Sequence, residues 1–419
     1  MMMKLAKSLA RSPALRAAAA MGGSGIVLAC GNLMLARVLA PEEFARFVLL
    51  YALMQIGINV GPIGADIILT RDPLDPGPRI HGQVLLTSCA VACVVIALSS
   101  IVYGIGPLLN AALWVSIATG GIRTVAIAHY RSQQRFNTAL LFTVSTNVAL
   151  LLASGVALFI RANTARLPAI VMALSLSVVA LIGWRSVVAD KARTERPAGG
   201  MQRYPWRAGW SAVSFTGAGM VLAALERLIT PQLLGLATMA TFSVLATVAG
   251  SPFTILYQGI GYTLLPGLRN AKDQAQRRKV LSHEGKVAAI ICTLAGIAAW
   301  WLTPIVIRYA LAGRYHIDSM LLLVTILSGV LKVASSLPAA TVSALGSTAD
   351  LARLSWIGWA SIAVGLGAAA IGAHWGLTGL VAGVALGWLV RTVAAAWLVL
   401  PHLLSTPATA GLSVRDANP

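Results

Sequence analysis

Three basic residues interrupt long apolar stretches of this chain, and their side chains are well suited to bind a charged ligand. Arg123, Lys332 and Arg391 each lie well inside such a stretch. A charge in a membrane-spanning segment costs about 2.5–3.5 kcal/mol on insertion scales, so it usually faces a cavity or a partner. Arginine binds phosphate oxygens in a bidentate manner, and lysine provides a point charge. We predict that the three residues line a cationic substrate-binding cavity, or that they pair with acids as structural bridges.

Three further charged residues lie nearer the ends of apolar stretches. Asp66, Glu226 and Arg227 are predicted to act in gating or ion coupling, and for Glu226 and Arg227 a structural role is favoured over substrate contact. Asn147 and Tyr257 are expected to form hydrogen bonds between helices, with sugar binding as the alternative. Because the deep charges are basic and the acids lie near the ends, the sequence favours an anionic cargo.

No pattern in the chain predicts a metal site, a cofactor or a catalytic centre. All four cysteines fall inside apolar stretches, so no disulfide framework is implied. The six histidines are scattered, and no Walker motif is present. We therefore expect no bound metal, no cofactor and no enzymatic activity.

The elements that must position these residues are membrane-spanning helices. Hydrophobic residues make up 58% of the chain and charged residues only 11%, with a mean hydropathy of +0.80. A membrane helix needs about 20 apolar residues. The sequence therefore predicts an all-α polytopic membrane protein with about twelve spans, which excludes soluble enzyme folds. The predicted spans are 17–36, 47–69, 83–104, 107–128, 139–160, 168–185, 209–229, 236–258, 287–311, 319–345, 354–373 and 377–400.

The basic charge of the chain follows its topology. The net charge is +19, and the Lys and Arg residues concentrate in the N-terminal tail and in the segments 185–207 and 269–286. With an even number of spans, the positive-inside rule places all of these segments and both termini in the cytoplasm. We therefore expect the lipid bilayer, and not a nucleic acid, as the partner of this charge. The predicted location is a bacterial inner membrane.

A polar linker divides the chain into two equal sets of spans. The segment 193–200 is rich in helix breakers, including Pro197 and a Gly199–Gly200 pair. We predict an N-terminal six-helix lobe at 1–185, a cytoplasmic linker at 186–208, a C-terminal six-helix lobe at 209–400 and a cytoplasmic tail at 401–419. Six is even, so both lobes enter the membrane from the same side, as parallel repeats related by a pseudo-twofold axis normal to the membrane do.

A segment after the first span resembles a known family. Residues 35–47 read LARVLAPEEFARF and are followed by Gly64 and Arg71, and Glu226 precedes Gly235 by nine residues. This is similar to the LAR-x-L-G-P-x-x-F-G-x-Y opening of the polysaccharide-repeat (oligosaccharidyl-lipid) flippases. These belong to the multidrug/oligosaccharidyl-lipid/polysaccharide exporter (MOP) superfamily. The chain departs from the pattern where the family has Gly, Gly and Tyr, at Ala40, Ala45 and Phe47.

The resemblance implies a transporter. Such a flippase moves a polyprenyl-pyrophosphate-linked oligosaccharide across the bacterial inner membrane by alternating access, for O-antigen, capsule or exopolysaccharide biosynthesis. A polysaccharide polymerase and glycosyltransferases of the same pathway would be its partners. Two alternatives remain: an ion-coupled multidrug antiporter of the same superfamily, and a membrane polysaccharide polymerase or ligase. The very short predicted outer loops favour a transporter over the enzyme.

Overall fold

The structure is a computed structural model that describes residues 13–71, 77–193, 204–271 and 273–404. In these ranges the chain is helical and contains no strand. Ten helical segments are long and apolar enough to cross a membrane, and the last of them, 349–400, contains two helices. The described apolar part of the first helix, Gly22–Val38, is shorter. The predicted all-α polytopic membrane fold is confirmed, and each of the twelve predicted spans coincides with a helical segment.

Seven helices lie in the described residues of the first half. They are α2 (Pro13–Val38), α3 (Pro41–Val60), α4 (Ala65–Arg71), α5 (Pro78–Tyr103), α6 (Pro107–Ser132), α7 (Phe136–Ile160) and α8 (Arg166–Arg193).

The second half begins at α9 (Trp206–Leu234). It continues with α10 (Leu236–Leu245), the π-helix η1 (Ala246–Gly250), α11 (Ser251–Asn270), α12 (Gln274–Ala310), α13 (Ser319–Leu345), α14 (Thr348–Gly372), η2 (Ala373–Trp375) and α15 (Gly376–Leu404).

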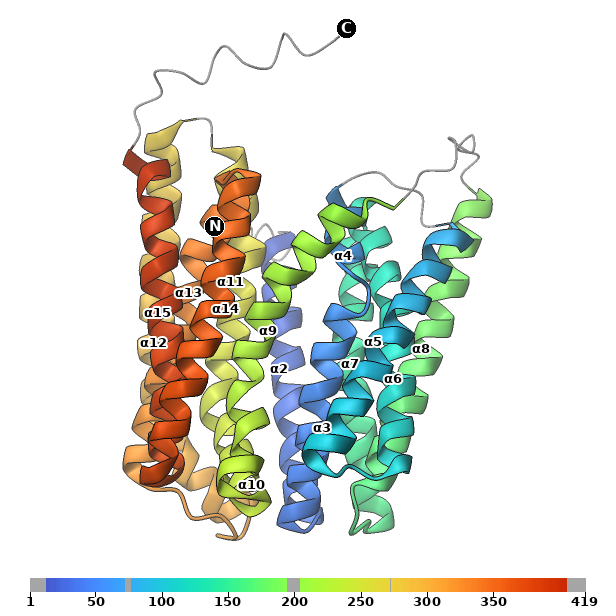
Figure 1. Ribbon diagram of the computed structural model, residues 1–419, viewed down its shortest axis with the longest axis vertical. Helices are drawn as coiled ribbons and strands as arrows, with labels where there is room; N and C mark the ends of the chain where they lie inside the picture. Colours follow the sequence, from blue (N-terminus) through green and yellow to red (C-terminus); the bar gives the residue numbers. More distant parts are fainter. Residues whose placement is uncertain (1–12, 72–76, 194–203, 272, 405–419) are drawn as a thin grey trace, which may run out of the picture.

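The helices form two groups that follow the chain order. Figure 1 shows α2 to α8 on one side and α9 to α15 on the other. Within the first group α2 packs on α7 and α6 on α8, and within the second α14 and α13 pack on α15. We call the end where α2 begins and α15 finishes the near end, and the opposite end the far end. In Figure 1 the groups are spread apart at the near end and converge at the far end.

Several helices extend beyond the predicted spans, and three spans, each with a proline, also differ in form or in where they end. Span two is not continuous, because α3 ends at Val60 and a turn through Pro62 separates it from α4. Span seven is longer than predicted, because α9 runs through Pro231 to Leu234. Span eight contains a π turn, η1, directly before Pro252. Proline lacks an N–H group, and membrane helices tolerate it where neighbouring groups compensate.

The family-like segment forms the start of α3 and part of the core. Pro41 occupies the first turn, where its missing N–H costs nothing, and Glu42 and Glu43 follow it at the positive end of the helix dipole. Glu43 accepts a hydrogen bond of 2.8 Å from the backbone N–H of Ala165 at the start of α8. Phe44 and Phe47 are fully buried. The segment therefore fixes the far end of the first half.

The two halves meet along α9, and also where α10 packs on α3 and α11 on α2. Helix α9 packs against α3 and α4 of the first half and against α14 and α15 of the second. At the near end the Tyr204 hydroxyl donates a 2.5 Å hydrogen bond to the Ile63 carbonyl. Gly209 lies so close that an added Cβ would be 2.6 Å from the same carbonyl oxygen. Glycine is therefore required where α9 crosses the first half.

Candidate functional site

Glu226 lies deeper than the sequence indicated. Because α9 continues to Leu234, the carboxylate is two turns from the helix end and only 2% exposed. The inference that acids sit near span ends is therefore wrong for this residue. Its carboxylate accepts a 2.9 Å hydrogen bond from Lys332 Nζ, and Ser328 Oγ lies 3.5 Å away. The structure thus joins two predicted site residues in one ion pair between α9 and α13.

Lys332 lies near the middle of α13, and its ammonium contacts Glu226 while part of its side chain stays exposed. Its side chain is 21% exposed, whereas that of Glu226 is buried. The ammonium also lies 5.8 Å from the centre of the Trp388 ring, a cation–π distance. An exposed ammonium in the middle of a membrane helix requires a polar surrounding. Lys332 can therefore reach a ligand while it remains beside its acid partner.

Arg391 lies on α15 beside the same tryptophan, and no acid pairs with it among the described residues. It is 3% exposed, its guanidinium is 5.7 Å from the Trp388 ring centre, and its Nη1 has no hydrogen-bond partner among the described residues. A Cβ added to Gly219 on α9 would lie 3.3 Å from Nη2 and 3.4 Å from Nη1. A buried donor group without a partner is costly. Nη1 is therefore free to donate a hydrogen bond to an anionic group.

A polar chain continues from α9 into the first half. Arg227 is half-buried and within electrostatic range of Tyr51 on α3. The Tyr51 hydroxyl donates to Asn147 Oδ1 at 3.2 Å and accepts from Gln55 at 2.7 Å. Asn147 in turn donates to Ser24 Oγ on α2 at 2.7 Å. Asn147 thus forms interhelical hydrogen bonds, and Arg227 lies where the two halves meet.

Arg123 is placed differently from Lys332 and Arg391. It is 6% exposed on α6, and its Nη1 donates to the Phe142 carbonyl at 3.0 Å and to Thr146 Oγ1 on α7. Tyr51 on α3 is an electrostatic neighbour of Arg123. Both acceptors of Nη1 belong to the first half. Arg123 therefore holds α6 to α7, and the predicted role in the cavity stays a prediction.

Asp66 is separate from the other predicted residues. It begins the short helix α4 at the near end, where Arg131 and Tyr204 are its charged and titratable neighbours. Burial, with Asp66 as a second cause, raises the pKa of Tyr204, so its hydroxyl remains a donor to Ile63. The structure therefore brings together Glu226 and Lys332, with Arg391 and Arg227 nearby, and leaves Asp66 apart.

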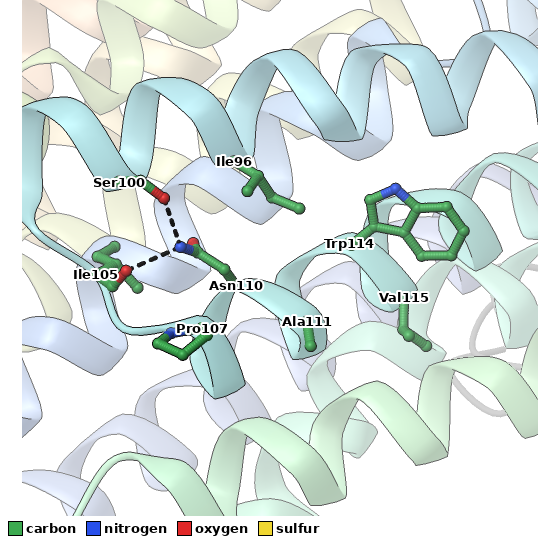
Figure 2. A pocket seen from close by; sticks show the side chains of 8 residues that line it. All are labelled: Ile96, Ser100, Ile105, Pro107, Asn110, Ala111, Trp114 and Val115. Atoms are coloured by element: carbon green, nitrogen blue, oxygen red, sulfur yellow. Dashed lines mark hydrogen bonds between the residues drawn. The ribbon is translucent and has the colours of Figure 1, made fainter.

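Two surface grooves lie away from these charges. Figure 2 shows one of 570 Å³ between α5 and α6 at the far end, where Trp114 and Pro107 line an apolar wall. Its polar residue, Asn110, donates to Ser100 and to the Ile105 carbonyl. The second, of 590 Å³, lies between α12 and α13 and is mostly apolar. Both grooves suit lipid chains better than a charged ligand.

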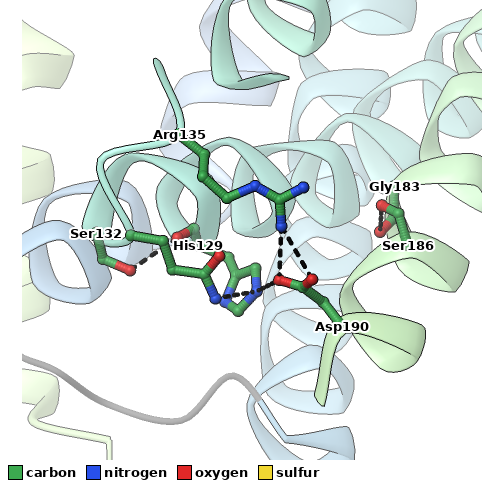
Figure 3. A network of polar contacts seen from close by, with 7 residues as sticks. His129, Ser132, Arg135, Gly183, Ser186 and Asp190 are labelled. Carbon is green, nitrogen blue, oxygen red and sulfur yellow. Dashed lines mark hydrogen bonds and ion pairs between the residues drawn. The ribbon is translucent and has the colours of Figure 1, made fainter. Parts of the chain in front are cut away.

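A polar network that the sequence did not reveal joins α6, α7 and α8 at the near end (Figure 3). Arg135 Nη1 donates to both Asp190 oxygens at 2.9 and 3.0 Å, and His129 Nε2 lies 3.4 Å from the same carboxylate. The Arg135 guanidinium also stacks 4.9 Å above Tyr130. All of these contacts lie within the first half. The network is therefore a brace of that half.

No family model and no curated protein matches the sequence. Solved structures do match it. The lipid II flippase MurJ in an inward closed conformation has a TM-score of 0.67 and 12% identity, over 92% of this chain and 87% of that chain. An inward-facing multidrug resistance MATE family transporter of the MOP superfamily has a TM-score of 0.61 and 15% identity, over 90% and 93%. A mutant of the Vibrio cholerae MATE transporter VcmN has a TM-score of 0.58 and 16% identity, over 95% of this chain and 99% of that chain.

These similarities cover nearly the whole of each chain, and at such low identity they concern the fold. They agree with the twelve helical segments in two groups described above. The chain is a multi-pass membrane protein with a fold similar to that of MOP-superfamily transporters.

Proposed function

We propose that this protein is a MOP-superfamily flippase that moves a polyprenyl-pyrophosphate-linked oligosaccharide across the bacterial inner membrane. The observation that carries this proposal is Arg391, a buried guanidinium whose Nη1 has no partner among the described residues. A pyrophosphate would supply the missing acceptors, since the guanidinium fork matches two phosphate oxygens. The fold similarity to the lipid II flippase MurJ supports the same class of cargo.

Lys332 supplies the second cationic group. It lies between Glu226 of α9 and the Trp388 ring, and its partial exposure leaves it free to contact an anion. Arg123, Arg227, Lys332 and Arg391 are opposed in this part of the bundle by one acid, Glu226. This excess of positive charge favours an anionic headgroup over an organic cation.

The transport cycle follows from the two groups of helices. The lobes 1–185 and 209–400 rock about the central charges, with the linker 186–208, the tail 401–419 and both termini in the cytoplasm. The basic segments at the near end support this orientation through the positive-inside rule. Glycosyltransferases would deliver the cargo on the cytoplasmic face, and a polysaccharide polymerase would use it on the outer face.

The test locates the lipid-linked intermediate in a deletion strain, with a membrane-impermeant probe applied to intact spheroplasts. We expect the intermediate on the inner face, rescue by the wild-type gene, and no rescue by Arg391→Ala or Lys332→Ala. Arg308→Ala is the matched control, because it removes an exposed arginine at the far end of α12. Normal outer-face intermediate in the deletion strain would overturn the proposal.

One observation favours a second candidate, the ion-coupled multidrug antiporter. Glu226 is a buried acid in the middle part of the bundle, and such an acid could hold an organic cation if Lys332 moved away. This candidate predicts that deletion raises sensitivity to cationic dyes and that Glu226→Gln does not restore resistance. The flippase proposal predicts unchanged dye sensitivity.

A further inference from the structure

Four hydrogen bonds join the two halves at the far end. Tyr103 Oη donates to the Leu228 carbonyl at 2.9 Å, and Gln232 Nε2 donates to the Val102 carbonyl at 2.6 Å. These two bonds connect the end of α5 to the last turns of α9. On the other side of the bundle, the loop after α12 reaches the end of α2. There Tyr315 Oη donates to the Ala36 carbonyl at 3.2 Å and Arg314 Nη1 to the Arg37 carbonyl at 2.9 Å.

Three of the four acceptors are carbonyls that their own helices leave unpaired. Ala36, Arg37 and Val102 lie in the last turns of α2 and α5, where carbonyl groups have no N–H four residues ahead within the helix. The residue four after Arg37 is Pro41, which has no N–H at all. The bonds therefore do not compete with the helices. When the halves separate, water can take the place of the donors without loss of a helical hydrogen bond at these three carbonyls.

The two sites correspond to one another. Matching the halves span by span in chain order pairs α2 with α9 and α5 with α12. In each site a tyrosine at or just after the third span of one half donates to a carbonyl near the end of the first span of the other half. Each tyrosine is accompanied by one exposed side-chain donor, Gln232 or Arg314. Tyr103 and Tyr315 thus hold equivalent places in the two halves.

We propose that these paired tyrosine contacts are the gate that keeps the far end of the transporter closed. We call them the far-end clasps. The first clasp consists of the bonds from Tyr103 to α9 and from Gln232 to α5. The second consists of the bonds from Tyr315 and Arg314 to α2. Because the two clasps lie on either side of the bundle, both must release before the halves separate there. This inference concerns the conformational change and does not depend on the cargo.

The chemistry of the clasps suits a gate. Burial raises the pKa of Tyr315, so its hydroxyl is a neutral donor throughout the physiological range. A hydrogen bond between neutral groups makes a modest net contribution, since water replaces it on opening. Three of the four bonds join neutral groups, and the fourth has the exposed Arg314 guanidinium as its donor. Such bonds can therefore hold the closed state without preventing turnover, and they involve no acid partner among the described residues.

The test measures distances between spin labels in the purified, full-length protein in lipid nanodiscs. The four native cysteines are replaced, and labels are placed on the exposed positions Arg161→Cys and His374→Cys at the far end, one in each half. A second pair, Arg135→Cys and Arg353→Cys, reports on the near end. The readout is the ratio of long to short far-end distances, which requires neither substrate nor knowledge of membrane orientation.

We expect Tyr103→Phe with Tyr315→Phe to increase that ratio by roughly 5- to 100-fold, and each single variant to give a comparable part of the change. Tyr309→Phe is the matched control, because this tyrosine is 75% exposed at the end of α12 and belongs to neither clasp. An unchanged far-end ratio in the double variant, at an unchanged melting temperature, would overturn the gate. So would an equal change in Tyr309→Phe. If the double variant does not fold, the two single variants decide the question by the same criterion.

Discussion

Arg123 and Arg391 are both buried arginines in the middle of membrane helices, yet they have opposite surroundings. Arg123 donates through Nη1 to the Phe142 carbonyl and to Thr146 within the first half, and its Nε has no partner among the described residues. Arg391, in the second half, faces Trp388 and Gly219, and its Nη1 has no partner among the described residues. Burial and charge are thus the same, and the partners differ. The comparison teaches that a costly intramembrane charge is structural where protein groups satisfy it and is a candidate for binding where they do not.

The largest expected effect concerns the ion pair between Lys332 and Glu226. Lys332→Met should destabilise the protein by roughly 3 kcal/mol, because it leaves the buried Glu226 carboxylate without its cation. Lys332→Met combined with Glu226→Gln should recover most of this loss, while transport stays impaired. Thermal unfolding in detergent measures the first effect and the spheroplast assay the second. A double variant no more stable than the single one would contradict the pairing.

Alanine variants test directly whether Arg391 and Arg123 have different roles. Arg391→Ala should reduce transport by roughly 100-fold with little change in melting temperature, because two hydrogen bonds to a charged group contribute about 3 kcal/mol or more. Arg123→Ala should do the reverse: a stability loss of about 2 kcal/mol, with transport retained in proportion to the folded protein. The assay compares transport per folded molecule with the unfolding midpoint. Equal transport defects at equal stability would remove the distinction between the halves.

A smaller change sharpens the assignment of Arg391. Gly219→Ala places a methyl group 3.3 Å from Nη2, in the space in front of the guanidinium. We expect transport to fall by about tenfold, as one contact to the anion is displaced, and stability to change by less than about 1 kcal/mol. Gly217→Ala is the control, because Gly217 lies two residues away on α9 and a Cβ added there would lie 3.7 Å from Val60 Cγ2. Identical transport in both alanine variants would place the anion elsewhere.

The smallest effect is expected at the near end of the first half. Arg135 is 50% exposed and pairs with Asp190 in the network of Figure 3. Because exposed ion pairs contribute little, Arg135→Gln should lower stability by about 0.2–1 kcal/mol and leave transport unchanged. Melting temperatures at low and high salt measure this difference. A loss as large as that of Lys332→Met would show that the brace stabilises the first half far more than its exposure indicates.

The sequence predicted the helices well because length and hydropathy determine which segments can cross a bilayer. It also identified Arg123, Lys332 and Arg391 as deep charges. It did not predict the depth of Glu226, because Pro231 and the polar residues around it resemble a helix end. Nor could it pair Glu226 with Lys332, or distinguish the surroundings of Arg123 from those of Arg391. Those contacts join helices distant in the chain, and their geometry depends on how the halves pack.

The tight crossing at Gly209 gives α9 a mechanical role. The helix is fixed against Ile63 at the near end by Gly209 and Tyr204, and Leu228 at its other end belongs to a clasp. The arm between these points is about 28 Å long, given a rise of ~1.5 Å per residue. A tilt of ~10° about the fixed point would move Leu228 by about 5 Å, further than any hydrogen bond reaches. The helix is therefore a lever with its fulcrum at the near end, and a small rotation there is enough to break a contact about 28 Å away at the far end.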